Sequence, residues 1–163
     1  MPHILFICTA NICRSPVAEG LLRKRLDEDG LVSWEVSSAG TWAQLRRGAA
    51  TTSVQLMAER GIDISNHRAR EVTAELLADA DLILCMEAGH AEALRVEFPE
   101  ARERIHVLSE MAGSNHNVED PYGGPYQGYV KMVDELSELI DAGLPRIIGL
   151  AGRNAYNKRQ REE

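Results

Sequence analysis

Apolar positions along the chain follow two spacings, one typical of buried strands and the other of amphipathic helices. Short segments at 3–7, 34–36, 81–86 and 104–108 predict four strands, the second ending at a break over 38–40. Helical spacing predicts helices at 16–28, 50–60 and 91–98, a short helix capped by Thr73, and a final helix through Tyr129, Val133, Leu136 and Ile140. Residues 109–125, rich in Gly, Asn, Asp and Pro, predict a loop.

Strands that alternate with helices predict an α/β fold with a four-stranded parallel sheet, helices on both faces and right-handed crossovers. Ligands in such folds bind at the carboxyl ends of the strands, and Cys8 directly follows the first one. We expect residues 1–163 to form a single domain. Its polar end, residues 152–163, is expected to be partly disordered.

The segment after the first strand combines a cysteine, an arginine and the start of a helix. Five residues separate Cys8 from Arg14, and Ser15-Pro16 favours a helix start. Asn11 suits a left-handed backbone in such a loop. Backbone N–H groups, a helix N-terminus and a guanidinium around one thiol predict a phosphate-binding loop with a nucleophilic Cys8. This loop comprises Thr9, Ala10, Asn11, Ile12, Cys13, Arg14 and Ser15.

The helix N-terminus cannot activate a thiol by itself. Lowering a cysteine pKa by about 3 units requires about 4 kcal/mol of preferential stabilisation of the anion. A helix dipole supplies about 0.3–1 kcal/mol. The loop N–H groups, the Ser15 hydroxyl and the Arg14 charge are therefore expected to supply the remainder.

Composition narrows the possible partners and the compartment. With 18 Lys and Arg against 25 Asp and Glu, the net charge of −7 argues against sequence-independent binding to nucleic acid or to an anionic membrane. An odd number of cysteines, no leader segment and no membrane-spanning run predict a reduced, cytoplasmic protein. The histidines and cysteines lack metal-ligand spacing, so we expect no metal and no cofactor. The sequence makes no prediction of oligomeric state.

Residues 8–16, Cys-Thr-Ala-Asn-Ile-Cys-Arg-Ser-Pro, resemble the signature loop of the low molecular weight protein tyrosine phosphatases. Segments 38–41, 66–70 and 120–124 resemble further motifs of that family, in its order and spacing. Ile7 precedes the cysteine, where other Cys/Arg phosphatases usually carry His. Ala10 replaces the usual Gly, which implies strain if that position needs a positive φ.

The resemblance implies a role for each matching residue. Cys8 attacks phosphorus and forms a phosphocysteine, while Arg14 and the loop amides stabilise the equatorial oxygens. Asp120 protonates the leaving oxygen and then activates water. The neighbouring Glu119 is the alternative acid, but unlike Asp120 it does not directly precede the proline. Ser15 stabilises the departing thiolate. A simpler interpretation of Asp120 is an Asp-Pro turn.

The expected partner is a protein phosphorylated on tyrosine. Ile12, Trp42, Tyr122 and Tyr126 are the candidates for an apolar and aromatic pocket wall, although Trp42 could equally be partly buried in the core. His67, Arg68 and Arg70 either brace the site or lie on the surface. Cys13, as in relatives, could trap an oxidised Cys8 as a reversible disulfide.

Three alternatives remain at this point. A protein arginine phosphatase resembles this layout but carries Thr at the position of Ile12. A thioredoxin-linked arsenate reductase needs two further cysteines; Cys85 could be the first, but Glu92 stands where the second belongs. A non-catalytic phosphate-binding module would need neither Cys8 nor Asp120.

Overall fold

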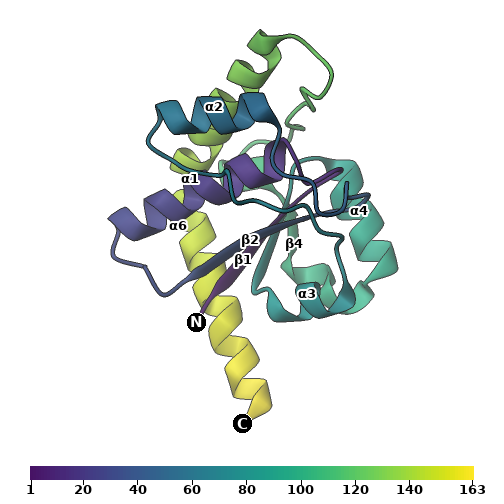
Figure 1. The fold of residues 1–163 in the computed structure, drawn as a ribbon. Coiled ribbons are helices and arrows are strands. Elements are labelled where there is room, and N and C mark those ends of the chain that lie inside the picture. Colours follow the sequence, from purple (N-terminus) through teal and green to yellow (C-terminus); the bar gives the residue numbers. More distant parts are fainter.

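The computed structural model describes residues 1–163 and contains one parallel sheet with strand order β2–β1–β3–β4 (Figure 1). The strands are β1 (His3–Cys8), β2 (Glu35–Gly40), β3 (Leu82–Cys85) and β4 (Ile105–Val107). The helices are α1 (Arg14–Glu28), α2 (Thr51–Glu59), α3 (Ala74–Asp79), α4 (Ala88–Glu97), the 3₁₀-helix η1 (Pro99–Arg104), α5 (Leu108–Met111) and α6 (Tyr126–Glu162).

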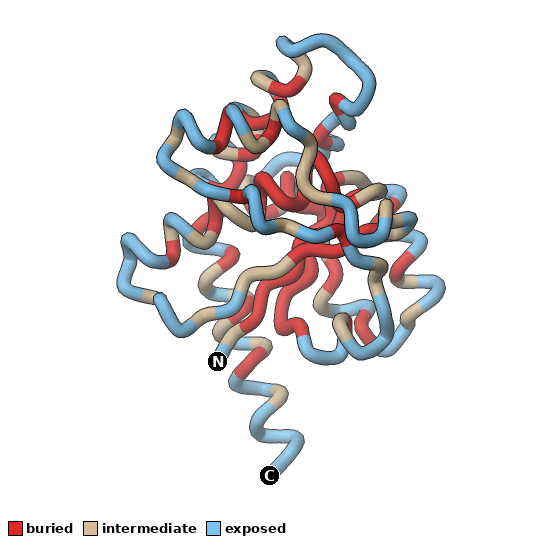
Figure 2. The backbone as a smooth tube through the Cα atoms, in the orientation of Figure 1, coloured by how far each residue is buried: buried red, intermediate tan, exposed pale blue.

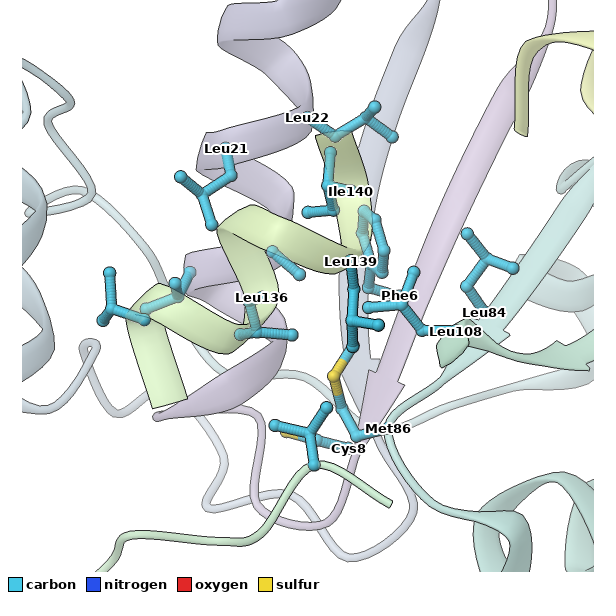
Figure 3. Close-up of a cluster of buried hydrophobic side chains, with 14 of the residues drawn as sticks. Phe6, Cys8, Leu21, Leu22, Leu84, Met86, Leu108, Leu136, Leu139 and Ile140 are labelled. Carbon is cyan, nitrogen blue, oxygen red and sulfur yellow. The ribbon is translucent and has the colours of Figure 1, made fainter. Parts of the chain in front are cut away.

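Side chains of β1 and β3 alternate between two apolar layers, one on each face of the sheet. Phe6 of β1 packs into a layer with α1 and α6, whereas its neighbour Leu5 packs into a layer with α3 and α4. β1 and β3 are accordingly buried along their whole length, whereas β2 is buried only in its second half (Figure 2). Figure 3 shows Phe6 and Leu84 of the sheet facing Leu136 and Ile140 of α6. The predicted parallel sheet with helices on both faces is confirmed.

The second strand is longer than predicted. The expected break at 38–40 does not occur, because these residues continue the ladder with β1 as far as the pair Cys8–Gly40. A Cβ at Gly40 would lie 2.3 Å from the carbonyl oxygen of Thr9. The absence of a side chain therefore lets the end of β2 lie directly against the loop that follows β1.

The end of the chain also differs from prediction. Residues 152–162, expected to be partly disordered, form the last turns of the 37-residue helix α6, whose end extends past the sheet (Figure 1). Tertiary contacts order this segment: Ala155 is buried, Asn154 Nδ2 donates to the Asp81 carbonyl at 2.8 Å, and Lys158 Nζ donates to the Ala78 carbonyl at 3.0 Å. No helix has both the length and the apolarity to cross a membrane.

Part of the segment predicted as loop, residues 109–125, is also helical, since α5 occupies its first residues. α5 packs closely against α6 at Gly143, where a Cβ would lie 2.8 Å from the Met111 Cβ. Only glycine permits this approach of the two helices.

Two glycines of α6 provide a matched test of this packing. Gly143→Ala should lower the free energy of unfolding, because overpacking costs about 1–3 kcal/mol and the gain in helix propensity is only about 1 kcal/mol. Gly149→Ala should raise it by about 0.5–1 kcal/mol, because no atom lies within 4 Å of the added methyl group. Urea denaturation measures both changes, and equal shifts in the two variants would contradict the packing at Met111.

Candidate active site

The loop between β1 and α1 lies at the carboxyl end of the sheet, and the carbonyl groups of residues 8–12 point into the surrounding protein. The backbone of residues 41–50 and the side chain of His67 supply the donors that fix them. The carbonyls of Cys8, Thr9, Ala10 and Ile12 accept from the N–H groups of Thr41, Trp42, Gln44 and Ala50 at 2.7–3.0 Å, and the Asn11 carbonyl pairs with His67 Nε2 at 2.6 Å.

The N–H groups of the same loop, in contrast to its carbonyls, have no partner in the protein. Those of residues 9–15 donate to no other group of the protein. α1 begins at Arg14, within this run and two residues earlier than predicted. A helix N-terminus thus adds its partial positive charge to a set of unused donors, an arrangement that suits a phosphate.

Asn11 holds the loop in shape. Its φ of 60° is left-handed, as predicted for Asn, and Ala10 has no positive φ. The condition for strain at Ala10, a positive φ, is therefore not met. Asn11 Nδ2 donates to Ser15 Oγ at 2.7 Å and to Ser38 Oγ at 3.0 Å, and its Oδ1 accepts from the Arg70 N–H at 3.0 Å. His67 and Arg70 thus brace the loop, one of the two interpretations of that segment.

Cys8 ends β1 with its sulfur inside this loop, and the residue is only 2% exposed. Its Sγ lies 2.9 Å from Ser15 Oγ. Since Ser15 Oγ already accepts a hydrogen bond from Asn11, its own proton is free to be donated to the sulfur. The arrangement can therefore stabilise negative charge on Cys8.

The Arg14 guanidinium is buried beside the loop and is held by groups from two other segments. Nη1 donates to Glu87 Oε2 at 2.5 Å and to the Val118 carbonyl at 2.8 Å, while Nη2 lies 3.3 Å from Thr9 Oγ1. Nε is buried without a partner in the protein. The fork is thus fixed in orientation and retains donor capacity for oxygens of a bound phosphate.

Glu87 and His90 are part of this network and were not predicted from the sequence. His90 Nε2 lies 2.9 Å from Thr9 Oγ1 and 3.7 Å from Glu87 Oε2. Burial, with a further contribution from the Arg14 charge, lowers the pKa of His90. One signal was available: Glu87 comes just after β3, and the carboxyl end of that strand lies beside the carboxyl end of β1.

Asp120 belongs to a turn and also faces the site. Its Oδ1 accepts from the Tyr122 N–H at 3.1 Å, as in an Asx-turn, and its Oδ2 lies 3.8 Å from Arg14 Nη2. Glu119 makes no such contact with Arg14. Between the two candidate carboxylates, the geometry brings Asp120 to the loop.

The other two cysteines lie in different surroundings. Cys13 is buried with its Sγ 3.9 Å from Tyr129 Oη, and burial raises its pKa to about 11. Cys85 is completely buried in the apolar layer of α3 and α4, across the sheet from the layer that contains Cys8, and burial raises its pKa as well. An arsenate reductase relay through Cys85 would need an accessible thiol, so this burial argues against it.

The expected pocket wall is only partly as predicted. Ile12 is 1% exposed and packs in the core beneath the loop, so it offers no surface to a substrate in this structure. Trp42 is 83% exposed, so it is not buried in the core, and its own N–H donates to the loop. Tyr122 and Tyr126 are each 52% exposed, Tyr122 two residues after Asp120 and Tyr126 at the start of α6.

Comparisons with known proteins agree with this geometry. The family model described as low molecular weight phosphotyrosine protein phosphatase matches residues 3–147. A protein-arginine-phosphatase of Bacillus subtilis is 37% identical over 138 residues, which cover 84% of this chain and 91% of that protein. A crystal structure of a low molecular weight protein tyrosine phosphatase from T. tengcongensis has a TM-score of 0.84 and 41% identity, covering 90% of this chain and 99% of the other.

A further solved structure bears on the cysteine of the loop. It is described as the arginine phosphatase YwlE in a cysteine-to-serine mutant with a phosphorylated active-site serine. Its TM-score is 0.85 at 33% identity, covering 93% of this chain and 99% of the other.

Proposed function

Because the chain belongs to the low molecular weight phosphotyrosine protein phosphatase family, we propose that it hydrolyses phosphotyrosine in proteins through a phosphocysteine on Cys8. The observation that carries this proposal is the loop itself. Its N–H groups are unused, and the Cys8 sulfur lies within reach of a donating Ser15 hydroxyl. Such donors stabilise both the thiolate and the oxygens of a phosphoryl group.

In the first step the Cys8 thiolate attacks phosphorus, and the bond between phosphorus and the tyrosine oxygen breaks. Asp120 gives its proton to that departing oxygen, which leaves as a neutral phenol. Arg14 and the loop N–H groups stabilise the charge on the three equatorial oxygens. The position of Asp120 Oδ2, 3.8 Å from Arg14 Nη2, supports its role as the acid.

In the second step Asp120, now a carboxylate, takes a proton from water as the water oxygen attacks phosphorus. The phosphorus–sulfur bond breaks, inorganic phosphate forms, and the thiolate is regenerated beside the Ser15 hydroxyl. The phosphorylated serine of the related YwlE mutant supports transfer of the phosphoryl group to this position of the loop. This chemistry assigns charge neutralisation to Arg14 and the backbone, with no metal and no cofactor.

We also propose a compartment and a partner for the enzyme. The nucleophile must remain a free thiol, and all three cysteines are free in the structure. We therefore place the activity in a reducing compartment such as the cytoplasm, with a phosphorylated protein as the partner. Cys13 remains a candidate to protect an oxidised Cys8.

Phosphoarginine is the second candidate substrate, favoured by the identity to the Bacillus subtilis enzyme. The exposed aromatic side chains Trp42 and Tyr122 favour tyrosine, since they can stack on a flat ring. The Ile12 position, where the arginine phosphatases carry Thr, is buried here and contributes no surface in favour of either substrate.

Matched peptides carrying phosphotyrosine or phosphoarginine test this choice, with EDTA present to remove adventitious metal. We expect kcat/KM to be at least about tenfold higher for phosphotyrosine, a difference of about 1.4 kcal/mol in the activation free energy. Release of inorganic phosphate measures both reactions. A higher value for phosphoarginine would reverse the assignment, and hydrolysis of neither peptide would leave phosphate binding alone as the function.

A further inference from the structure

Three arginines that the phosphatase mechanism does not use lie on or against the segment that bonds to the phosphate loop. Arg46 and Arg47 belong to the segment 41–50 that bonds to the phosphate loop, and their backbone pairs with Ala69 at 2.8–2.9 Å. Arg68 lies against the same segment, since a Cβ at Gly48 would be 3.6 Å from its Nη1. We define Arg46, Arg47 and Arg68 as the basic rim.

The three charges of the basic rim are exposed, and none of them forms an ion pair within the protein. Nearby carboxylates are otherwise engaged. Glu71 accepts a hydrogen bond from the Ala43 N–H at 2.8 Å, and Asp120 accepts from the Tyr122 N–H and lies near Arg14. In a chain of net charge −7, an unpaired cluster of this kind is a local reversal of sign.

Arg47 is already oriented across the mouth. Its Cζ lies 5.9 Å from the centre of the Tyr122 ring, and its Nη1 donates to Gln44 Oε1. The contact joins the segment 41–50 to the turn that contains Asp120. Arg46 has a φ of 65°, a conformation rare for residues other than glycine and frequent at functional sites.

We propose that the basic rim binds carboxylates that flank the phosphorylated residue, so that the preferred substrates are acidic around their phosphotyrosine. The inference rests on the proposed function and names its substrate class. The phosphate loop takes the phosphoryl group, and the guanidinium groups of the rim remain to pair with Asp or Glu of an extended peptide. Arg47 needs little reorganisation for this, because Tyr122 and Gln44 hold it in place.

Three phosphotyrosine peptides test the proposal. The first has glutamates next to the phosphotyrosine on both sides, the second has glutamines there, and the third carries the same glutamates at its distant end. At low ionic strength we expect kcat/KM for the first to exceed the other two by about three- to tenfold, through a lower KM, and the difference should shrink in high salt.

Substitutions of the three arginines test whether the basic rim causes the preference for the first peptide. Arg47→Gln should bring the ratio between the first and second peptides close to one, with smaller losses for Arg46→Gln and Arg68→Gln. Arg102→Gln is the matched control, since Arg102 is exposed and unpaired on η1, which precedes β4 and so lies at the other end of the sheet. That variant should keep the wild-type ratio.

The outcomes separate this inference from the proposed function. Equal rates on the first two peptides would overturn the basic rim as a recognition surface and leave the phosphotyrosine phosphatase intact. Equal rates on the first and third would show steering by net charge, which also overturns it. Hydrolysis of none of the peptides would overturn both proposals.

Discussion

Cys8→Ser is expected to lower kcat for p-nitrophenyl phosphate by about 10⁴-fold or more, the order of effect seen when other covalent enzymes lose their nucleophile. A serine hydroxyl is scarcely ionised at neutral pH, so the donors around position 8 no longer have an anion to stabilise. The structure predicts that phosphate binding survives, since the N–H groups of residues 9–15 and the Arg14 guanidinium are unchanged. Calorimetric titration with inorganic phosphate measures this second property.

Cys85, the buried cysteine farthest along the chain, provides the control. Cys85→Ala should retain activity, because Cys85 lies in the apolar layer on the other side of the sheet. Intact-mass measurement after acid quenching should find a phosphorylated species in the wild type. Turnover by the Cys8→Ser variant at a rate near that of the wild type would exclude Cys8 as the nucleophile.

Arg14→Lys is expected to reduce kcat/KM by about 10²–10³-fold, as when one preorganised donor to a developing charge is removed. Two nitrogens of the guanidinium have different roles. Nη1 is fixed by Glu87 and the Val118 carbonyl, and the buried Nε, which has no partner in the protein, is expected to donate to a phosphoryl oxygen. An ammonium keeps the charge beside Glu87 but cannot serve both groups at once. We therefore expect weaker vanadate binding with little loss of stability, measured by titration and by thermal unfolding.

Glu87→Gln separates two effects of Glu87 on Arg14, the orientation of the guanidinium and the neutralisation of its charge. The amide can still accept from Arg14 Nη1, but it no longer neutralises the buried guanidinium. We expect a smaller loss of activity than in Arg14→Lys together with a lower melting temperature, since the charge of Arg14 stays buried with less compensation. Vanadate affinity of Arg14→Lys equal to that of the wild type would contradict the proposed fork.

The local pattern of the chain predicted much of the fold. The segment at 81–86 is apolar after Asp81, and this is the signature of a central strand covered on both faces, as β3 is. Thr73 was predicted to cap a helix, and its Oγ1 accepts from the Leu76 N–H at 3.1 Å. Such signals lie within a few residues of each other, so no tertiary information is needed to interpret them.

The errors have a common cause, which is that contacts with distant parts of the chain override the local pattern. Residues 38–40 were predicted as a break, but pairing with β1 supplies the hydrogen bonds that local propensity does not count. Residues 152–162 were predicted to be disordered because they are polar, but contacts with the ends of α3 and β3 hold them in α6. Ile12 was placed on the pocket wall, but the loop turns its side chain into the core.

The order Cys8, Asn11, Arg14 and Ser15 after an apolar strand was sufficient to predict a phosphate loop, because its donors come from neighbouring residues and from the helix that they begin. The groups that hold this loop in place could be identified only from the tertiary structure. Glu87, the carbonyl of Val118 and the N–H groups of residues 41–50 are distant in sequence, and each acts through a single contact. Only the packing of β2 and β3 on either side of β1 brings them to the same end of the sheet.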